Sequence, residues 1–271
     1  MKRIFTLALT VAAISSITVG CATRMSTQKI EASDKMMTKT LEVDDLNKLE
    51  VSSQIHVVYV QSNESSAEFV APDNVMEYYR YKVSDGKLKV WKEGHSHNLM
   101  FKNNNNPKLI VKSPNLNGID ISGACTFTAK KIDLNKGDME VQLSGASKLN
   151  LETLNCGKAK FDLSGASSAK VATVNVIDLS GECSGASNLG MIINGAETVS
   201  ADCSGASTIT LGGTARKVNL DCSGASKISA GELKAETGSV DASGASSIQS
   251  NIKTLTSKDS SGVSSIKNNV D

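Results

Sequence analysis

Six copies of the tetrapeptide Ser-Gly-Ala-Ser recur along the second half of the chain, beginning at Ser144, Ser164, Ser184, Ser204, Ser223 and Ser243. A variant with Cys125 in fourth place begins at Ser122, and a variant with Val263 in third place begins at Ser261. Successive starts are 22, 20, 20, 20, 19, 20 and 18 residues apart. A period this constant indicates that each interval is one copy of a structural unit.

Apolar and polar side chains alternate on both sides of each tetrapeptide. Before Ser144, for example, Met139, Val141 and Leu143 are apolar, and Leu149 is the apolar fifth residue after it. Alternation with period two around a Gly-containing corner predicts two short strands that meet at a tight bend. A leucine-rich repeat would need a spaced Leu and Asn signature, and a propeller blade needs about twice as many residues. The sequence therefore predicts an all-β fold, a right-handed parallel β-helix (β-solenoid) of about 20-residue coils, the hand following the strong preference of parallel crossovers.

The tetrapeptide itself is interpreted as a structural corner. Stacked coils lie about 4.8 Å apart, so a corner must repeat with one shape, and glycine allows a bend where a larger side chain would collide. Serine hydroxyls can satisfy backbone groups along the stack. The alternative is a serine nucleophile or a ligand-binding ladder. The predicted corner residues are Ser144, Gly145, Ser164, Gly165, Ser184, Gly185, Ser204, Gly205, Ser223, Gly224, Ser243 and Gly244.

The N-terminus has the features of an export signal. Lys2 and Arg3 precede a mostly apolar run over 4–19, which is shorter than the roughly 20 residues that span a bilayer and is interrupted by serines. Residues 18–21 resemble a bacterial lipobox, although threonine stands at the usual leucine position, and this predicts a signal peptide over 1–20 and lipidation of Cys21. Simple cleavage and release is the alternative. The polar stretch over 21–39 is predicted to be a flexible tether.

Two further segments follow the tether. Residues 40–115 contain strand signals without the repeat, including a hairpin in which 79–83 and 87–91 are joined through 84–86, and we expect an irregular β-rich segment that caps the first coil. Residues 116–271 are predicted to be the β-helix repeats. The last unit has Lys258 and Ser260 at positions that are apolar in earlier coils, which is typical of a polar cap.

An acidic column precedes the corners. The residue two positions before each first serine is Asp120, Gln142, Asp162, Glu182, Asp202, Asp221, Asp241 and Asp259 in turn. Since their neighbours on either side are predicted to point inward, these side chains should point outward as a candidate binding ladder. One interpretation is that each carboxylate accepts hydrogen bonds from its own corner. The other is that the ladder recruits calcium or a cationic partner, because hard cations favour clustered oxygen ligands.

Several function classes find no support in the composition. With 29 basic and 28 acidic residues, no basic excess points to nucleic acid. No Gly-x-Ser-x-Gly elbow, phosphate loop or dinucleotide fingerprint occurs, so no catalytic residue is assigned and no enzyme is predicted. The segment 93–97 contains two histidines and one glutamate and is interpreted as a solvated loop. No metal site and no cofactor are predicted, calcium at the ladder being the exception left open.

The cysteines after the lipobox are odd in number, so they cannot all pair within one chain. Cys183, Cys203 and Cys222 each stand immediately before a corner serine, in a column that is otherwise apolar. This pattern predicts buried small side chains. Cysteines stacked in one column also lack the tetrahedral arrangement of a zinc site.

The repeated tetrapeptides, the stretch Asp-Gly-Lys-Leu-Lys-Val at 85–90 and the Ser-Pro pair at 113–114 together resemble the family of bacterial auto-transporter adhesin, head GIN domain proteins. The resemblance covers residue 40 to the C-terminus. It implies a right-handed β-helix, export to the cell envelope as in many Bacteroidetes lipoproteins, and an adhesion role without catalytic residues.

We therefore expect a lipid-anchored binding or adhesion module, facing the periplasm or the cell surface of the outer membrane, with a glycan or protein ligand. A periplasmic scaffold or stress-related lipoprotein with a protein partner is the alternative, and a carbohydrate-active enzyme is a remote one.

Overall fold

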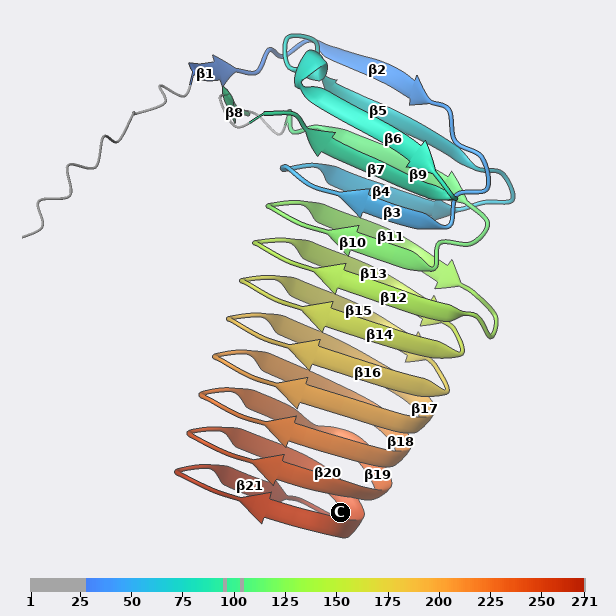
Figure 1. The fold of residues 1–271 in the computed structure, drawn as a ribbon. Helices are drawn as coiled ribbons and strands as arrows, with labels where there is room; N and C mark the ends of the chain where they lie inside the picture. The colour runs from blue at the N-terminus through green and yellow to red at the C-terminus, as the bar shows by residue number, and fades with distance from the viewer. Residues whose placement is uncertain (1–27, 95–96, 103–104, 271) are drawn as a thin grey trace, which may run out of the picture.

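A computed structural model describes residues 28–94, 97–102 and 105–270. They form an elongated stack of coils, with the N-terminal layers at one end and the C-terminus at the other (Figure 1). Within these ranges the helical structure consists of one short 3-10 turn, Met76–Tyr78. None of the described residues belongs to a helix with the length and apolar character that crossing a membrane requires.

Nine strands precede the tetrapeptide repeats. They are β1 (Gln28–Glu31), β2 (Met36–Leu41), β3 (Lys48–Val51), β4 (His56–Gln61), β5 (Ser66–Pro72), β6 (Tyr79–Ser84), β7 (Lys87–Lys92), β8 (His97–Met100) and β9 (Lys108–Ser113). The predicted hairpin is confirmed, because β6 pairs antiparallel with β7 around Asp85 and Gly86, both at positive φ.

Twelve strands make up the repeats. They are β10 (Gly118–Ile121), β11 (Thr126–Asp133), β12 (Asp138–Leu143), β13 (Lys148–Asn155), β14 (Lys158–Leu163), β15 (Ser168–Asn175), β16 (Asp178–Cys183), β17 (Asn188–Cys203), β18 (Thr208–Cys222), β19 (Lys227–Ala242), β20 (Ser247–Ser260) and β21 (Ser265–Asn268). Each of β17 to β20 is a single strand that runs continuously around the bend on the opposite side of the coil from the tetrapeptide.

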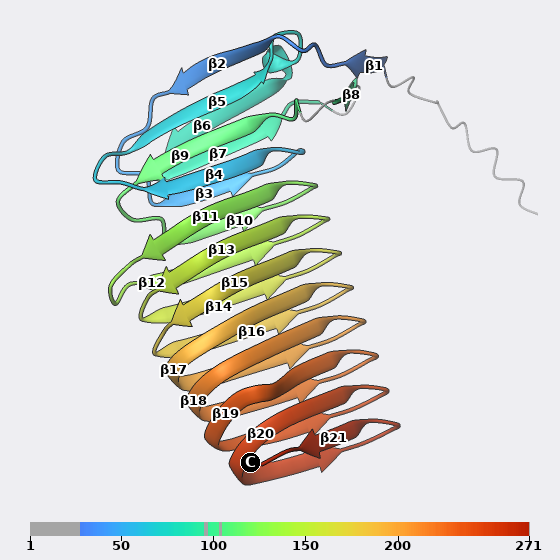
Figure 2. The same ribbon diagram turned by 180° about the vertical axis from the view of Figure 1, so that it is seen from behind.

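The solenoid predicted from the repeat is confirmed. Equivalent strands of successive coils pair in parallel and in register, as β10 does with β12 and β11 with β13. This pairing gives the stack two broad faces (Figures 1 and 2). We call the outward surface of β7, β3, β10, β12, β14, β16 and the C-terminal halves of β17 to β20 the β10 face. The outward surface of β9, β4, β11, β13, β15, the N-terminal halves of β17 to β20 and β21 is the β11 face.

The stack begins earlier than residue 116, where the repeats were predicted to start. Strand β3 pairs in parallel with β10, and β4 pairs in parallel with β11, so the pair β3 and β4 is already a coil. Above it β7 and β9 continue the two faces. The capping layer is regular: β5 pairs antiparallel with β9, and β2 pairs antiparallel with β5.

The tether predicted over 21–39 is wrong in its second half. Residues 28–31 form β1, which pairs in parallel with β8, and residues 36–41 form β2 at the edge of the capping layer. The six residues of β2 have one buried side chain, Leu41, so the apolar alternation that marks a strand is missing from the sequence. Its backbone pairing with β5 holds it in place instead. The signal peptide, the lipidated Cys21 and the rest of the tether lie outside the described residues.

The core is a set of apolar columns between the two faces. One column runs from Ile121 through Leu143 and Leu163 to three cysteines and Ala242, all in register and at most 3% exposed. A neighbouring column alternates in size, since Phe161 lies beside Gly181 in register. A β-carbon on Gly181 would lie 2.8 Å from Leu189 Cδ2, so the core is closely filled there.

Candidate functional site

The Ser-Gly-Ala-Ser phrases lie at tight turns between the two faces. Each second-position glycine has positive φ, for example +68° at Gly185. A β-carbon on Gly185 would lie 2.7 Å from the carbonyl oxygen of Gly165 in the preceding coil. The turns therefore stack so closely that the preceding coil excludes a β-carbon, at a backbone conformation that also favours glycine.

The two serines of each phrase differ in their surroundings. The fourth-position serine is buried, and its hydroxyl donates to a carbonyl of the preceding coil, as Ser207 Oγ does to Cys183 O at 3.0 Å. The same bond recurs at Ser187 and Ser246. The first-position serine is half-buried, and Ser184 Oγ makes a long contact of 3.5 Å with Leu163 O. Each fourth-position hydroxyl thus has a structural partner, and within the described residues no histidine is hydrogen-bonded to a corner serine.

The acidic column lies on the β10 face in continuous register. Asp120 pairs with Gln142, and Asp162, Glu182, Asp202, Asp221, Asp241 and Asp259 follow in the coils below. All of these side chains are exposed except that of Asp162, which is half-buried. The column also extends upward, because Asp120 is in register with Glu50, which sequence reasoning missed. The pattern Leu49, Glu50, Val51, Ser52 could have revealed it, since it matches Ile119 to Ser122.

The carboxylates do not bond to their own corners as the first interpretation proposed. In the described residues, Asp202, Asp221 and Asp241 have no hydrogen bond or ion pair. The corner amides are already committed to the preceding coil: Ser204 N donates to Cys183 O at 2.9 Å and Ala206 N to Gly185 O at 2.7 Å. Asp259 accepts a hydrogen bond at 2.8 Å, but from Ser257 on its own strand.

Lysines neutralise the upper part of the column. Glu50 lies 2.5 Å from Lys89 Nζ and 3.0 Å from Lys87 Nζ, and the hydrogen bond from Lys89 lowers the pKa of its carboxyl. Glu182 forms an ion pair with Lys160 at 3.2 Å. Partial burial, with the nearby charge of Glu50, raises the pKa of Asp120.

The lower part of the column has no such compensation. Desolvation first, and then the charges of Asp202 and Asp241, raise the pKa of Asp221. Two residues before these aspartates, at the next outward position of each strand, stand Ser200, Asn219 and Ser239, which carry no charge. The result is an exposed row of like charges bordered by hydroxyl and amide groups.

No group of three His, Cys, Asp or Glu side chains among the described residues is arranged to hold a metal ion. A linear row presents each cation with carboxylates from one side, whereas calcium prefers six to eight oxygen ligands around it. Calcium at the ladder therefore stays a hypothesis. In the loop with two histidines, 95 and 96 lie outside the described residues.

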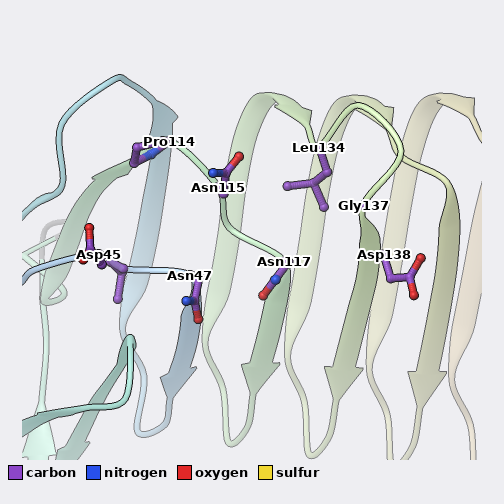
Figure 3. A pocket seen from close by; sticks show the side chains of 9 residues that line it. Asp45, Asn47, Pro114, Asn115, Asn117, Leu134, Gly137 and Asp138 are labelled. Atoms are coloured by element: carbon purple, nitrogen blue, oxygen red, sulfur yellow. The ribbon is translucent and has the colours of Figure 1, made fainter.

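A pocket of about 380 Å³ lies where residues 45–47 meet the linker 114–117 and the turn 134–138 (Figure 3). Its acidic side chains, Asp45 and Asp138, lie at opposite ends, with Asn47 and Asn117 between them (Figure 3). A backbone hydrogen bond joins two segments that line the pocket: Asn117 N donates to Asn47 O at 2.8 Å. Two carboxylates that far apart do not form an acid–base pair, so the pocket is a gap between irregular connections.

A wider groove of about 870 Å³ lies on the β11 face, across β4, β11, β13 and β15. Val58, Val60 and Ala172 line it together with polar and charged side chains, among them Lys130, Lys170 and Glu152. This groove was not predicted from the sequence. The signal was present in the lysines at outward positions of the strands that follow the corners.

The five cysteines of the described part are all buried and free. Burial raises the pKa of Cys156 to about 12 and that of Cys183 to about 11. The hydrogen bond with Cys222, together with burial, raises the pKa of Cys203. The same hydrogen bond lowers the pKa of Cys222. Cys156, Cys183 and Cys203 are therefore packing groups, and Cys183 and Cys203 stand in the apolar column with Cys222.

Comparisons with known proteins agree with this architecture. A putative adhesin from Bacteroides fragilis is 20% identical, with a TM-score of 0.63, over 89% of this chain and 100% of its own. A putative adhesin from Parabacteroides distasonis is 17% identical, with a TM-score of 0.66, over the same shares. A putative lipid binding protein from that organism is 14% identical, with a TM-score of 0.59, over 88% of this chain and 99% of its own. At such identities the likeness shows a shared fold.

No curated protein sequence matches the chain. The family model described as "Putative auto-transporter adhesin, head GIN domain" matches residues 45–192 and 160–269, which together span most of the chain. These ranges include the coil of β3 and β4 as well as every Ser-Gly-Ala-Ser turn. The chain belongs to the putative auto-transporter adhesin, head GIN domain family.

Proposed function

We propose that the chain is an exported, lipid-anchored binding module of the bacterial envelope, which adheres to an extended ligand without chemical turnover. The observation that carries this proposal is the lower part of the acidic column. Asp202, Asp221 and Asp241 are exposed in register at the coil spacing of about 4.8 Å and are used by no contact within the described fold. A row of identical groups at fixed spacing suits a ligand that is itself repetitive.

The family supports adhesion, and the outer membrane is the location we propose. Lipidation of Cys21 would hold the solenoid at the membrane through residues 22–27. The ligand class that fits the row is a cationic or hydroxyl-rich polymer, meaning a glycan or a protein surface. Catalysis is not part of the proposal, because the two carboxylates of the pocket of about 380 Å³, Asp45 and Asp138, lie at its opposite ends.

The binding role is tested with the triple substitution D202N/D221N/D241N. We expect it to lose at least tenfold in affinity for the ligand found by a glycan array or by pulldown from envelope extract. The control is E152Q/E232Q, which removes two carboxylates from the β11 face and should bind as the unaltered chain does. Equal binding by both variants would show that the row is not the binding surface.

Anchoring and exposure need a separate experiment. The Cys21→Ala variant should move from the membrane fraction to the soluble one and lose incorporation of labelled fatty acid. Protease digestion of intact cells then tests the location, since adhesion requires a chain that is cut from outside. A chain that is protected until the outer membrane is opened would favour the periplasmic scaffold with a protein partner.

A further inference from the structure

The upper coils of the β11 face are positively charged, whereas the acidic surface of the β10 face lies in the lower coils. On β9, β4, β11, β13 and β15 the β11 face presents five exposed lysines, none of which forms an ion pair within the described residues: Lys108, Lys112, Lys130, Lys148 and Lys170. Among the exposed outward side chains of these strands Glu152 carries the single opposing charge, since half-buried Asp133 is already paired with Lys131 at 2.7 Å. The whole chain is close to neutral, at +1. The asymmetry is therefore a matter of placement and not of composition.

The same face is partly apolar. Val60 is 47% exposed and Ile192 is 58% exposed, and both project outward from this face, on β4 and β17, with the coils of β11, β13 and β15 between them. Between them lies the groove of about 870 Å³, with Val58 and Ala172 in its lining. The strands that carry these groups lie side by side in the stack (Figure 2).

We propose that the β11 face docks on an anionic lipid surface. The lysines match negative headgroups, and the exposed Val60 and Ile192 match the acyl boundary just below them. Lysine stems can lie along apolar surface while their ammonium groups reach the headgroups. A soluble polyanion would pair with the lysines but would leave the apolar side chains in water. A lipid surface would contact both the lysines and the apolar side chains of this face.

This docking fixes the orientation of the whole molecule. The β10 face lies on the other side of the stack, and its lower carboxylates would be repelled by the same headgroups. The solenoid would lie along the membrane with the acidic row turned outward. That orientation leaves the row free for the ligand proposed above, although the docking itself does not depend on that ligand.

The test is binding of the full chain to vesicles of phosphatidylglycerol and phosphatidylcholine against vesicles of phosphatidylcholine alone. The variant K130Q/K148Q/K170Q removes charge from the β11 face. The matched control, K158Q/K160Q/K217Q, removes the same charge from the opposite side. Both carry the same residues 1–27, so any contribution of the leader cancels in the comparison.

We expect the β11-face variant to lose roughly 100-fold in partitioning into anionic vesicles, at about fivefold per lysine, and the control to lose little. A polarity-sensitive dye on Asn150→Cys should shift to the blue on binding, while the same dye on Ser200→Cys should not. Equal losses in the two lysine variants, or a shift at both dye positions, would overturn the proposal. So would binding to dextran sulfate without binding to vesicles, or self-association that D202N/D221N/D241N abolishes.

Discussion

The requirement for glycine at the corners can be tested at Gly185 by the substitution Gly185→Ala. The residue has φ of +68°, where an L side chain costs about 1–2 kcal/mol. The new β-carbon would lie 2.7 Å from the Gly165 oxygen and 3.1 Å from its nitrogen, and these backbone atoms cannot rotate away. Forcing such a contact typically costs a further 1–3 kcal/mol. We expect a total loss of about 2–5 kcal/mol in the free energy of unfolding.

The control is Gly190→Ala, five residues further along the same coil, on β17. A β-carbon there meets no atom within 4 Å, and its φ is not in the left-handed region. That variant should be unchanged or more stable by about 0.4–1 kcal/mol, because alanine restricts the unfolded chain. Gly185→Asn separates the two costs, since asparagine tolerates positive φ but carries the same β-carbon.

The assay is urea unfolding combined with hydrogen exchange of the amides in β16 and β17. Exchange is needed because stacked repeats can open locally, so one global midpoint can miss a local loss. Gly185→Ala should exchange faster in these two strands first. If Gly185→Ala and Gly190→Ala unfold within about 0.5 kcal/mol of one another, the reasoning about corner stacking is refuted.

Three further predictions concern single side chains of the coils. Ser207→Ala should lower the free energy of unfolding in urea by about 1 kcal/mol, because it removes a buried hydroxyl that bonds Cys183 O at 3.0 Å and Ser204 O at 2.7 Å. The control Ser200→Ala, at an exposed position, should leave it almost unchanged. Asp133 has its pKa lowered to about 2, chiefly by Lys131, so its contribution is complete above about pH 4 and is lost as the pH falls toward 2. Urea melts at pH 2 to 5 should therefore show a shallower acid loss in Asp133→Asn than in the unaltered chain, and parallel curves would contradict this. Asp221 has a raised pKa, so its ionised form opposes folding above that pKa, and Asp221→Asn should gain up to about 1 kcal/mol at pH 7 in low salt, a gain that disappears at pH 3 and shrinks in 1 M salt.

The repeat, its coil length and the direction of each side chain could be read from the sequence because they follow from local rules. Period-two alternation placed Val141 and Leu143 inside and Gln142 outside, and the structure agrees. The cysteines before the corners are buried as predicted, since their column is set by the same alternation.

The rest depended on contacts between segments far apart in sequence. Strand β2 is defined by its pairing with β5, and no local pattern in 36–41 predicts that pairing. The acidic column was visible as a list of residues, but the lack of corner hydrogen bonds could be found only once Ser204 N and Ala206 N were seen to bond the preceding coil. The groove on the β11 face likewise needs Val60, Lys130 and Ala172 from three different coils to be placed side by side.

The uppermost corner explains what the glycine column does. At the turn between β3 and β4, Ser53 stands beside Gly123 and has φ of +77°, so an L residue is accepted there. The β-carbons of lower corners point to the turn of the preceding coil, as that of Gly145 would toward Gly123. Within the described residues β7 is followed in the chain by β8 and not by β9, so the two strands above Ser53 are not joined directly by such a turn.

Backbone conformation alone therefore does not impose glycine on the column, and stacking does. Each corner can be added below an existing one only if its second residue carries no β-carbon. This requirement fixes every coil in the register of the coil above. The outward columns inherit that register, so acidic side chains on one face and lysines on the other are held at the coil spacing without any contact among themselves. A chain built in this way can change its binding surfaces freely while its corners stay the same.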